Sequence, residues 1–88
     1  MQKVLKVHPD DNLIVALQDL AAGEQVSLDG EMFAVVSPTP AKHKFAAAQL
    51  NQGDRVLMYG VLVGRAVQPI QRGEIITTFN VKHASTPP

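Results

Sequence analysis

The chain has 88 residues, of which 45% are hydrophobic, and its eight basic residues balance eight acidic ones. This length suits one domain with a modest core, and the composition is too hydrophobic for a disordered segment. The absence of cysteine excludes a disulfide framework, a thiolate nucleophile and Cys-based zinc or iron–sulfur sites, while the zero net charge and scattered basic residues disfavour nucleic-acid binding.

Short strands separated by glycine and proline account for most of the chain. The apolar stretch over residues 12–17 has strand length. Asp29-Gly30 suits a type I′ hairpin turn, and Gly60 marks a second hairpin. In chain order, the expected strands cover residues 4–8, 12–17, 26–28, 32–36, 55–59 and 62–67, and residues 77–79 extend the last strand.

Helix is nearly absent from the prediction. Only Phe45–Leu50 has helical propensity, and this segment holds about one and a half turns. The pattern predicts a mostly β, all-β domain over residues 1–82, with short strands, hairpins and at most one short helix. We expect residues 83–88 to form a flexible C-terminal tail.

A seven-residue pattern recurs three times: an apolar residue, two variable residues, glycine, an acid, a variable residue and an apolar residue. It occupies residues 20–26, 50–56 and 70–76. Glycine supplies the positive φ that closes a turn, the acid lies on the exposed rim, and the apolar ends return to the core. Because the copies start 30 and 20 residues apart, we interpret them as a reused turn and not as a solenoid of fixed period.

The apolar stretches are too short for a membrane span. The longest, Leu13–Leu17 and Val61–Val63, fall far below the roughly 20 residues that a spanning helix needs. Residues Met1–Lys6 contain no extended apolar region and no small-residue cleavage site, so the sequence does not indicate a secretory signal. We expect a cytoplasmic protein without a membrane partner.

His8 is the first candidate for chemistry, because histidine is a frequent general base and metal ligand. It precedes Pro9, Asp10, Asp11 and Asn12, whose side chains offer oxygen and nitrogen ligands for a metal or a substrate hydroxyl. The same residue types also cap backbone amides in turns. A structural turn is therefore the alternative for this segment.

His43 is the second candidate, and it stands between Lys42 and Lys44. A histidine flanked by two lysines at the mouth of a turn could meet a carboxylate substrate, and the alternative is a solvated basic loop. His83 falls in the predicted tail, where we expect it to be inert. The sequence contains no nucleophile elbow, phosphate-binding loop or paired-histidine metal motif.

Five segments, in order, resemble the altronate/galactarate dehydratase family. The resemblance covers residues 7 to 80 and is carried by Val7–Leu17, Asp19–Glu24, Pro40–Ala46, Gly53-Asp54 and Tyr59–Ala66. It implies the N-terminal SAF domain of that family, a β-clip fold shared with type III antifreeze proteins and the C-terminal domain of sialic acid synthase. In the related sulfolactate sulfo-lyases, the SAF part and the larger catalytic part are separate small and large subunits.

The resemblance implies that the chain is a small subunit or an SAF domain of a hydro-lyase acting on a sugar acid, and that it is not a complete enzyme alone. Such an elimination needs a base for the proton next to the carboxylate, and an acid or metal for the leaving hydroxyl. The implied partners are a large catalytic subunit and the sugar-acid substrate, and a homo-oligomer is compatible with both. The implied cofactor is a divalent metal, iron, bound mainly by the larger subunit, with none evident in this chain.

Carried over position by position, His43 is the candidate catalytic residue, and His8, Asn12 and Lys44 are candidates for contact with the substrate or the partner. The chain departs from the family at Met58, where a lysine is frequent, and at residues 77–79, where histidines are frequent. An alternative is a non-catalytic SAF module that binds carbohydrate or a protein partner. A further alternative is a degenerate domain that only stabilises its partner, which the missing histidines favour.

Overall fold

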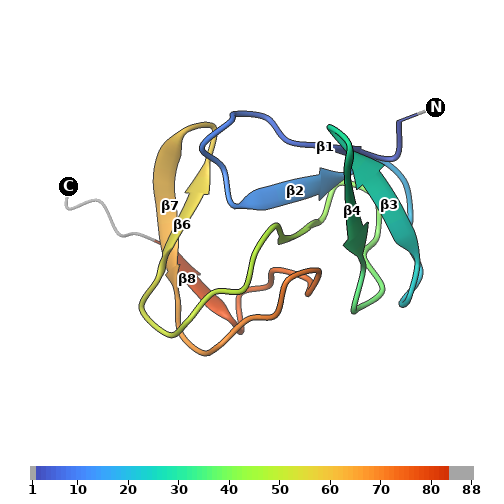
Figure 1. Cartoon of the computed structure of the whole chain (residues 1–88). Helices are drawn as coiled ribbons and strands as arrows, with labels where there is room; N and C mark the ends of the chain where they lie inside the picture. The colour runs from blue at the N-terminus through green and yellow to red at the C-terminus, as the bar shows by residue number, and fades with distance from the viewer. Residues whose placement is uncertain (1, 84–88) are drawn as a thin grey trace.

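The computed structural model describes residues 2–83, which form three small antiparallel sheets (Figure 1). The first sheet has the order β1-β2-β5, the second pairs β3 with β4, and the third has the order β6-β7-β8. The strands are β1 (Val4–Leu5), β2 (Leu13–Ala16), β3 (Gln25–Leu28), β4 (Glu31–Ala34), β5 (Lys44–Ala46), β6 (Arg55–Met58), β7 (Val61–Ala66) and β8 (Val81–His83). The predicted all-β class is confirmed.

The helical propensity of Phe45–Leu50 is not realised, because no residue between 2 and 83 belongs to a helix. Phe45 instead lies in β5, pairs with Ile14 of β2 and is fully buried. This pairing prevails because an alanine-rich segment of six residues is too short to be stable as a helix. The described part of the chain accordingly has no helix long and apolar enough to cross a membrane.

The last strand also differs from the prediction. Residues 78–80 form a turn, and β8 begins after it, at Val81. The turn is fixed by Asn80, which is buried and accepts the Thr77 N–H on its side-chain oxygen at 2.8 Å. His83 belongs to β8, so the folded domain continues past the predicted boundary, and the rest of the predicted tail lies outside the described residues.

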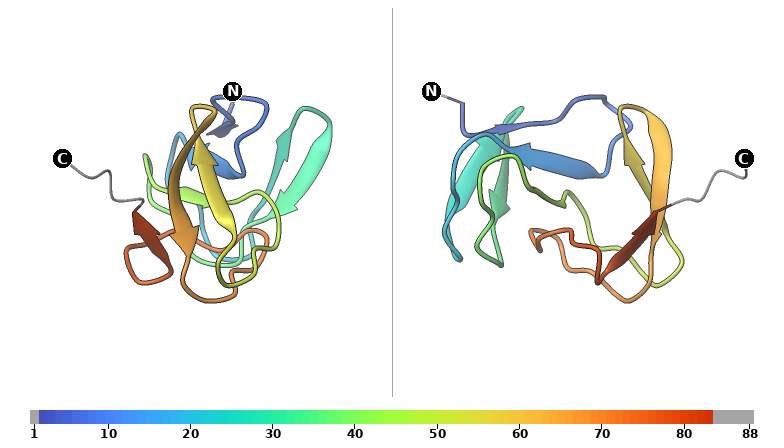
Figure 2. Two further views of the ribbon diagram at one scale, coloured as in Figure 1. Left: turned by 90° about the vertical axis from the view of Figure 1, so that its left-hand side faces the viewer. Right: turned by 180° about the vertical axis from the view of Figure 1, so that it is seen from behind.

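Both predicted hairpins are confirmed, and they stand at opposite ends of the molecule with β2 between them (Figures 1 and 2). The β3–β4 hairpin turns at Asp29 and Gly30, with φ of 51° and 80°. The β6–β7 hairpin turns at Tyr59 and Gly60, with φ of 57° and 74°. Positive φ at both residues is the requirement of a type I′ turn, whose twist matches that of the strands.

The three predicted glycine–acid turns share one geometry. Their glycines have φ of 86°, 90° and 88° at Gly23, Gly53 and Gly73, and each acid donates its N–H to the carbonyl three residues earlier, as in a type II turn. The acids do more than occupy an exposed rim. Each carboxylate also accepts a backbone N–H, at 3.0 Å for Glu24 with Ala21, 2.7 Å for Asp54 with Asn51 and 2.9 Å for Glu74 with Gln71.

Residues 40–43 form a fourth turn of the same kind. Lys42 occupies the glycine position with φ of 74°, and His43 occupies the acid position, its N–H donating to Pro40 O at 3.0 Å. Each of the four turns clamps one residue, in a strand or directly after one, between two backbone hydrogen bonds. The clamped residues, for the turns at 23, 42, 53 and 73, are Val35, Ala16, Ala66 and Ala46.

The four turns and the residues they clamp indicate that the chain contains two copies of one unit. Thirty residues separate Gly23 from Gly53, but thirty-one separate Lys42 from Gly73. The additional residue is Val63, which is skipped where the register of β6 and β7 shifts. This β-bulge inserts one residue into the second copy, so a search for a fixed period does not find the repeat.

The core has two parts, and β2 and β5 contribute to both because alternate strand residues face opposite sides. Ile14 and Phe45 belong to the first cluster, and Leu13 and Ala46 belong to the second. The second cluster also contains Val56, Met58, Ala66, Ile70 and Val81. Four of its members form part of the wall of the cavity described below.

Candidate functional site

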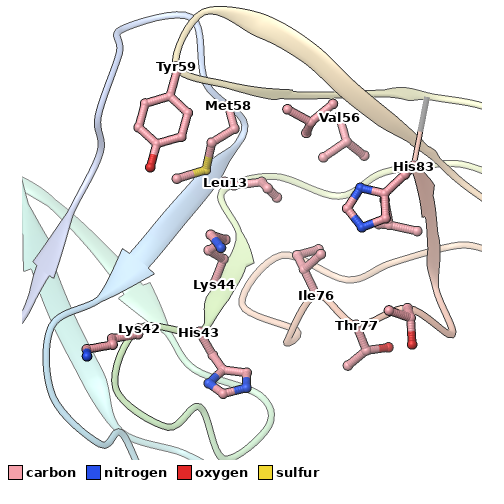
Figure 3. A pocket seen from close by; sticks show the side chains of 13 residues that line it. Leu13, Lys42, His43, Lys44, Val56, Met58, Tyr59, Ile76, Thr77 and His83 are labelled. Carbon is pink, nitrogen blue, oxygen red and sulfur yellow. The ribbon is translucent and has the colours of Figure 1, made fainter. Parts of the chain in front are cut away.

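A cavity of about 590 Å³ opens between β5, the β6–β7 hairpin and β8 (Figure 3). Apolar side chains of the second core cluster form part of its wall, and basic and hydroxyl side chains complete it. The lining residues are Leu13, Lys42, His43, Lys44, Val56, Met58, Tyr59, Val63, Ile76, Thr77, Thr78, Val81 and His83. An apolar cavity with a few polar groups is the usual form of a small-molecule site.

The charge of the cavity is one-sided. Its thirteen lining residues include two lysines, two histidines and two threonines, but no aspartate or glutamate. The whole chain has a formal net charge of zero, so the positive charge is concentrated locally. Such a site favours an anionic ligand with hydroxyl groups.

His43 reaches the cavity from the fourth turn. In the other three turns, the side chain at this position caps the N–H of the first turn residue, but here that residue is Pro40, which has no N–H. The His43 ring is exposed, and its Nδ1 lies 3.4 Å from Ala41 O, a long hydrogen-bond contact. The capping role of this position is therefore absent from the fourth turn, and the imidazole remains accessible to a ligand.

Lys42 and Lys44 flank His43 but lie differently. Lys44 is half-buried in β5, and Figure 3 shows it between Leu13 and His43. Lys42 is exposed and extends away from the other labelled side chains in the same view. Its left-handed backbone costs about 1–2 kcal/mol in a residue other than glycine, and strain of this kind concentrates at functional sites.

His8, unlike His43, does not line the cavity. Its Nδ1 accepts the Asp10 N–H at 3.1 Å, and its ring lies against Gly60, where a Cβ atom would come within 2.9 Å of Nε2. The neighbouring hairpin residue, Tyr59, does line the cavity and is 64% exposed. His8 therefore supports the hairpin at the rim of the cavity.

Asp11 and Asn12 hold the same hairpin in place. The buried carboxylate of Asp11 accepts the N–H groups of His8, Tyr59 and Gly60 at 3.1, 3.0 and 2.8 Å. The Asn12 side chain donates to Arg55 O and accepts the Leu57 N–H, both at 2.8 Å. These contacts match the amide-capping alternative for the segment. The predicted ligand contacts of His8 and Asn12 stay predictions.

Three residues that line the cavity were not predicted as site residues from the sequence: Thr77, Thr78 and His83. His83 follows the 78–80 turn and comes two residues after the buried Val81 in β8. The alternation of apolar and polar residues over 81–83 was the signal in the sequence that could have placed His83 in a strand. That signal could not be used while the last strand was placed over residues 77–79. Thr77 and Thr78 were noted as departures from a family pattern, and the structure places both in the wall of the cavity.

The residues described here do not provide a metal site of their own. Between residues 2 and 83, no group of three or more His, Cys, Asp or Glu side chains could hold a metal ion. His43 and His83 line the cavity without a carboxylate beside them in its wall. The donor set therefore does not fit iron, and we derive no chemical step through a metal held by this chain.

Comparison with known proteins decides the family. The sequence model of the altronate/galactarate dehydratase SAF domain matches residues 2–84. The chain belongs to this family. The β strands, the cavity and the turn carrying His43 all lie within the matched residues, so the SAF domain accounts for the entire described structure.

Three relatives show how this SAF domain is used in chains of different length. The altronate dehydratases of Bacillus subtilis and Escherichia coli are 33% identical over 82 residues and 35% identical over 78 residues. These matches cover 93% and 89% of this chain but 16% of each relative. The (2R)-sulfolactate sulfo-lyase subunit alpha of Chromohalobacter salexigens is 32% identical in an alignment 84 residues long, which covers 86% of this chain and 89% of that subunit.

Proposed function

We propose that this chain is the SAF part of a hydro-lyase that acts on a sugar acid, and that it works beside a larger catalytic polypeptide. The observation that carries the proposal is the acid-free cavity, whose wall contains His43, on a turn freed from its capping role, and Lys44, the first residue of β5. The names of the relatives, altronate dehydratase and sulfolactate sulfo-lyase subunit alpha, support an elimination from a hydroxy acid.

The chemistry of such an elimination assigns separate roles to the two residues. A base takes the proton from the carbon next to the carboxylate, the C–H electron pair becomes a double bond, and the hydroxyl on the following carbon leaves as water after gaining a proton. With its proton on Nδ1, facing Ala41 O, the His43 ring presents a lone pair on Nε2 for the first proton transfer. Lys44 binds the substrate carboxylate.

The larger polypeptide supplies what this chain lacks. The two altronate dehydratases are about six times as long as the part that this chain matches, and the described residues provide no metal ligand set. We therefore assign the divalent metal, iron, and the departure of the hydroxyl to the larger polypeptide. A cavity that is partly open to solvent is consistent with a substrate enclosed between two partners.

The rim of the cavity is the proposed contact with that polypeptide. The tip of the β6–β7 hairpin exposes Tyr59, Val61 and Leu62 to 64%, 57% and 42%, and Tyr59 belongs to both the tip and the cavity wall. His8 supports this tip from behind through Gly60. Apolar side chains held by a rigid turn suit the centre of a protein interface.

The test is to purify the chain together with the larger polypeptide encoded beside it, provided that polypeptide resembles the remainder of an altronate dehydratase. Dehydration of altronate and galactarate, and sulfite release from (2R)-sulfolactate, are measured with wild-type chain, with His43→Ala, with Gln49→Ala as an exposed control, and without the chain. The proposal expects activity that requires the chain and is lost in His43→Ala alone. Full activity without the chain would refute it, and full activity of His43→Ala would leave a non-catalytic SAF module.

A further inference from the structure

His83 stands on the wall of the cavity opposite the turn that carries His43. Figure 3 shows its ring at the right of the cavity and His43 below, with Ile76 between them and Thr77 below His83. Both imidazoles line the same cavity although 40 residues separate them in the sequence. The proposed function assigns a role to His43 and none to His83.

The position of His83 is fixed by strand pairing. Residues 81–83 pair antiparallel with β7, and His83 is opposite Gly64. Gly64 permits this close approach, because a Cβ atom there would collide with the backbone oxygen of Lys82. The strand therefore lies against β7 along its whole length, and His83 is held by sheet geometry.

The alternation of β8 directs His83 to the cavity. Side chains two residues apart in a strand share one face, and Val81, which is 6% exposed, belongs to the second core cluster and lines the cavity. His83 shares that face, whereas Lys82 points to the other one. An exposed imidazole next to an apolar wall can donate a hydrogen bond to a ligand in the cavity.

The neighbours of His83 in the wall are suited to an oxygen-rich ligand. Thr77 and Thr78 lie in the same wall, and no carboxylate among the lining residues competes for the imidazole N–H. A hydroxy acid that placed its carboxylate at Lys44 and extended across the cavity would bring its distal hydroxyl or second acidic group to the wall that contains His83.

We infer that His83 is a further substrate-contacting residue, which binds the end of the hydroxy acid that lies farthest from His43 and Lys44. This inference rests on the proposed function. It assigns His83 to binding, while His43 keeps the proton transfer. A binding contact that is equally strong in the ground state and the transition state changes KM and leaves kcat unaltered.

The experiment uses the chain purified with its larger polypeptide and compares His83→Ala, His83→Gln and Lys82→Ala, the last being the matched change on the opposite face of β8. We expect KM for the accepted acid to rise about tenfold in His83→Ala with kcat within about twofold, which corresponds to about 1.4 kcal/mol. Gln restores a hydrogen-bond donor, so His83→Gln recovers part of the loss. Lys82→Ala leaves KM unchanged.

Three outcomes overturn the inference: an unchanged KM in His83→Ala, an equal rise in Lys82→Ala, or no recovery by Gln. Thermal unfolding of each variant shows whether a loss of binding reflects a loss of fold. The failure of this inference is distinguishable from the failure of the proposed function. If activity requires the chain and His43 but is unchanged in His83→Ala, the proposed function is retained and the substrate contact of His83 is rejected.

Discussion

Lys42 and Gly73 hold the same backbone conformation at equivalent places in the two copies of the unit, with φ of 74° and 88°. Each donates its N–H to the carbonyl of a clamped alanine, Ala16 for Lys42 and Ala46 for Gly73. The second copy keeps the glycine and its capping acid, and the first carries a lysine and a histidine instead. One turn is therefore specialised toward the cavity at a cost in stability.

Replacing Lys42 by glycine is expected to raise the free energy of unfolding by about 1 kcal/mol, because glycine adopts a positive φ without steric cost and loses part of the gain to its larger unfolded-state entropy. Urea denaturation measures the difference. The reverse change at a sibling turn, Gly53→Lys, is the control. A Cβ atom at Gly53 has nothing within 4 Å, so only the cost of the positive φ contributes. We expect the free energy of unfolding to fall by about 1 kcal/mol. A Lys42→Gly variant that is less stable than the wild type contradicts the strain argument.

Asp11 is expected to be the most sensitive polar residue of the fold. Its buried carboxylate accepts three backbone N–H groups, and Asp11→Ala leaves these donors without a partner, at a cost of about 3 kcal/mol or more. The exposed Asp10 is the matched control, and Asp10→Ala is expected to cost less than about 0.5 kcal/mol. Equal stability of the two variants in chemical denaturation would show that the hairpin does not depend on Asp11.

Substitution of Asn12 distinguishes a structural role of this residue from a ligand-binding role. Because both ends of its amide are engaged by β6, Asn12→Ala is expected to lower the free energy of unfolding by about 1–2 kcal/mol. KM of the assembled enzyme, measured well below the unfolding temperature, is expected to stay within about twofold of the wild-type value. A large rise in KM with unchanged stability would instead support the predicted substrate contact.

Glu24 gives the fold a defined dependence on pH. The Ala21 N–H, and after it the Lys3 amine, lower the pKa of Glu24 below its ordinary value of 4.5. A carboxyl whose folded pKa is lowered stabilises the fold fully above its unfolded pKa, and this stabilisation is lost as the pH falls through the folded pKa. The difference in unfolding free energy between the wild type and Glu24→Gln should therefore be present at neutral pH and shrink as the pH falls below the ordinary carboxyl pKa and through the lowered folded pKa. A difference that is constant with pH would exclude this role of the carboxylate.

The sequence predicted those parts of the fold that depend on local geometry. Asp29-Gly30 and Gly60 were recognised as hairpin turns, because few residues adopt positive φ without cost. The glycine–acid turns were recognised for the same reason. The fourth turn was missed because Lys42 stands at the glycine position and His43 at the acid position. Neither residue type indicates a turn with positive φ.

The candidate site depends on tertiary pairing, which a single sequence reveals only in part. His43 and Lys44 were identified from their basic neighbourhood and from the family resemblance, and both line the cavity. His83 was assigned to a tail, because nothing local indicates that Asn80 closes a turn and returns the chain to β7. The role of Asp11 as a three-way acceptor was likewise hidden, since two of its three donors lie 48 and 49 residues away.

The most direct test of the central claim is a titration of the larger polypeptide with this chain, followed by the rate of elimination from the accepted hydroxy acid. We predict a rate that rises from background and saturates with wild-type chain. With His43→Ala, binding should saturate over the same concentrations while the maximal rate is at least about 100-fold lower, as expected for the loss of a general base. A maximal rate that does not depend on the chain, or that is equal for the wild type and His43→Ala, would contradict the account.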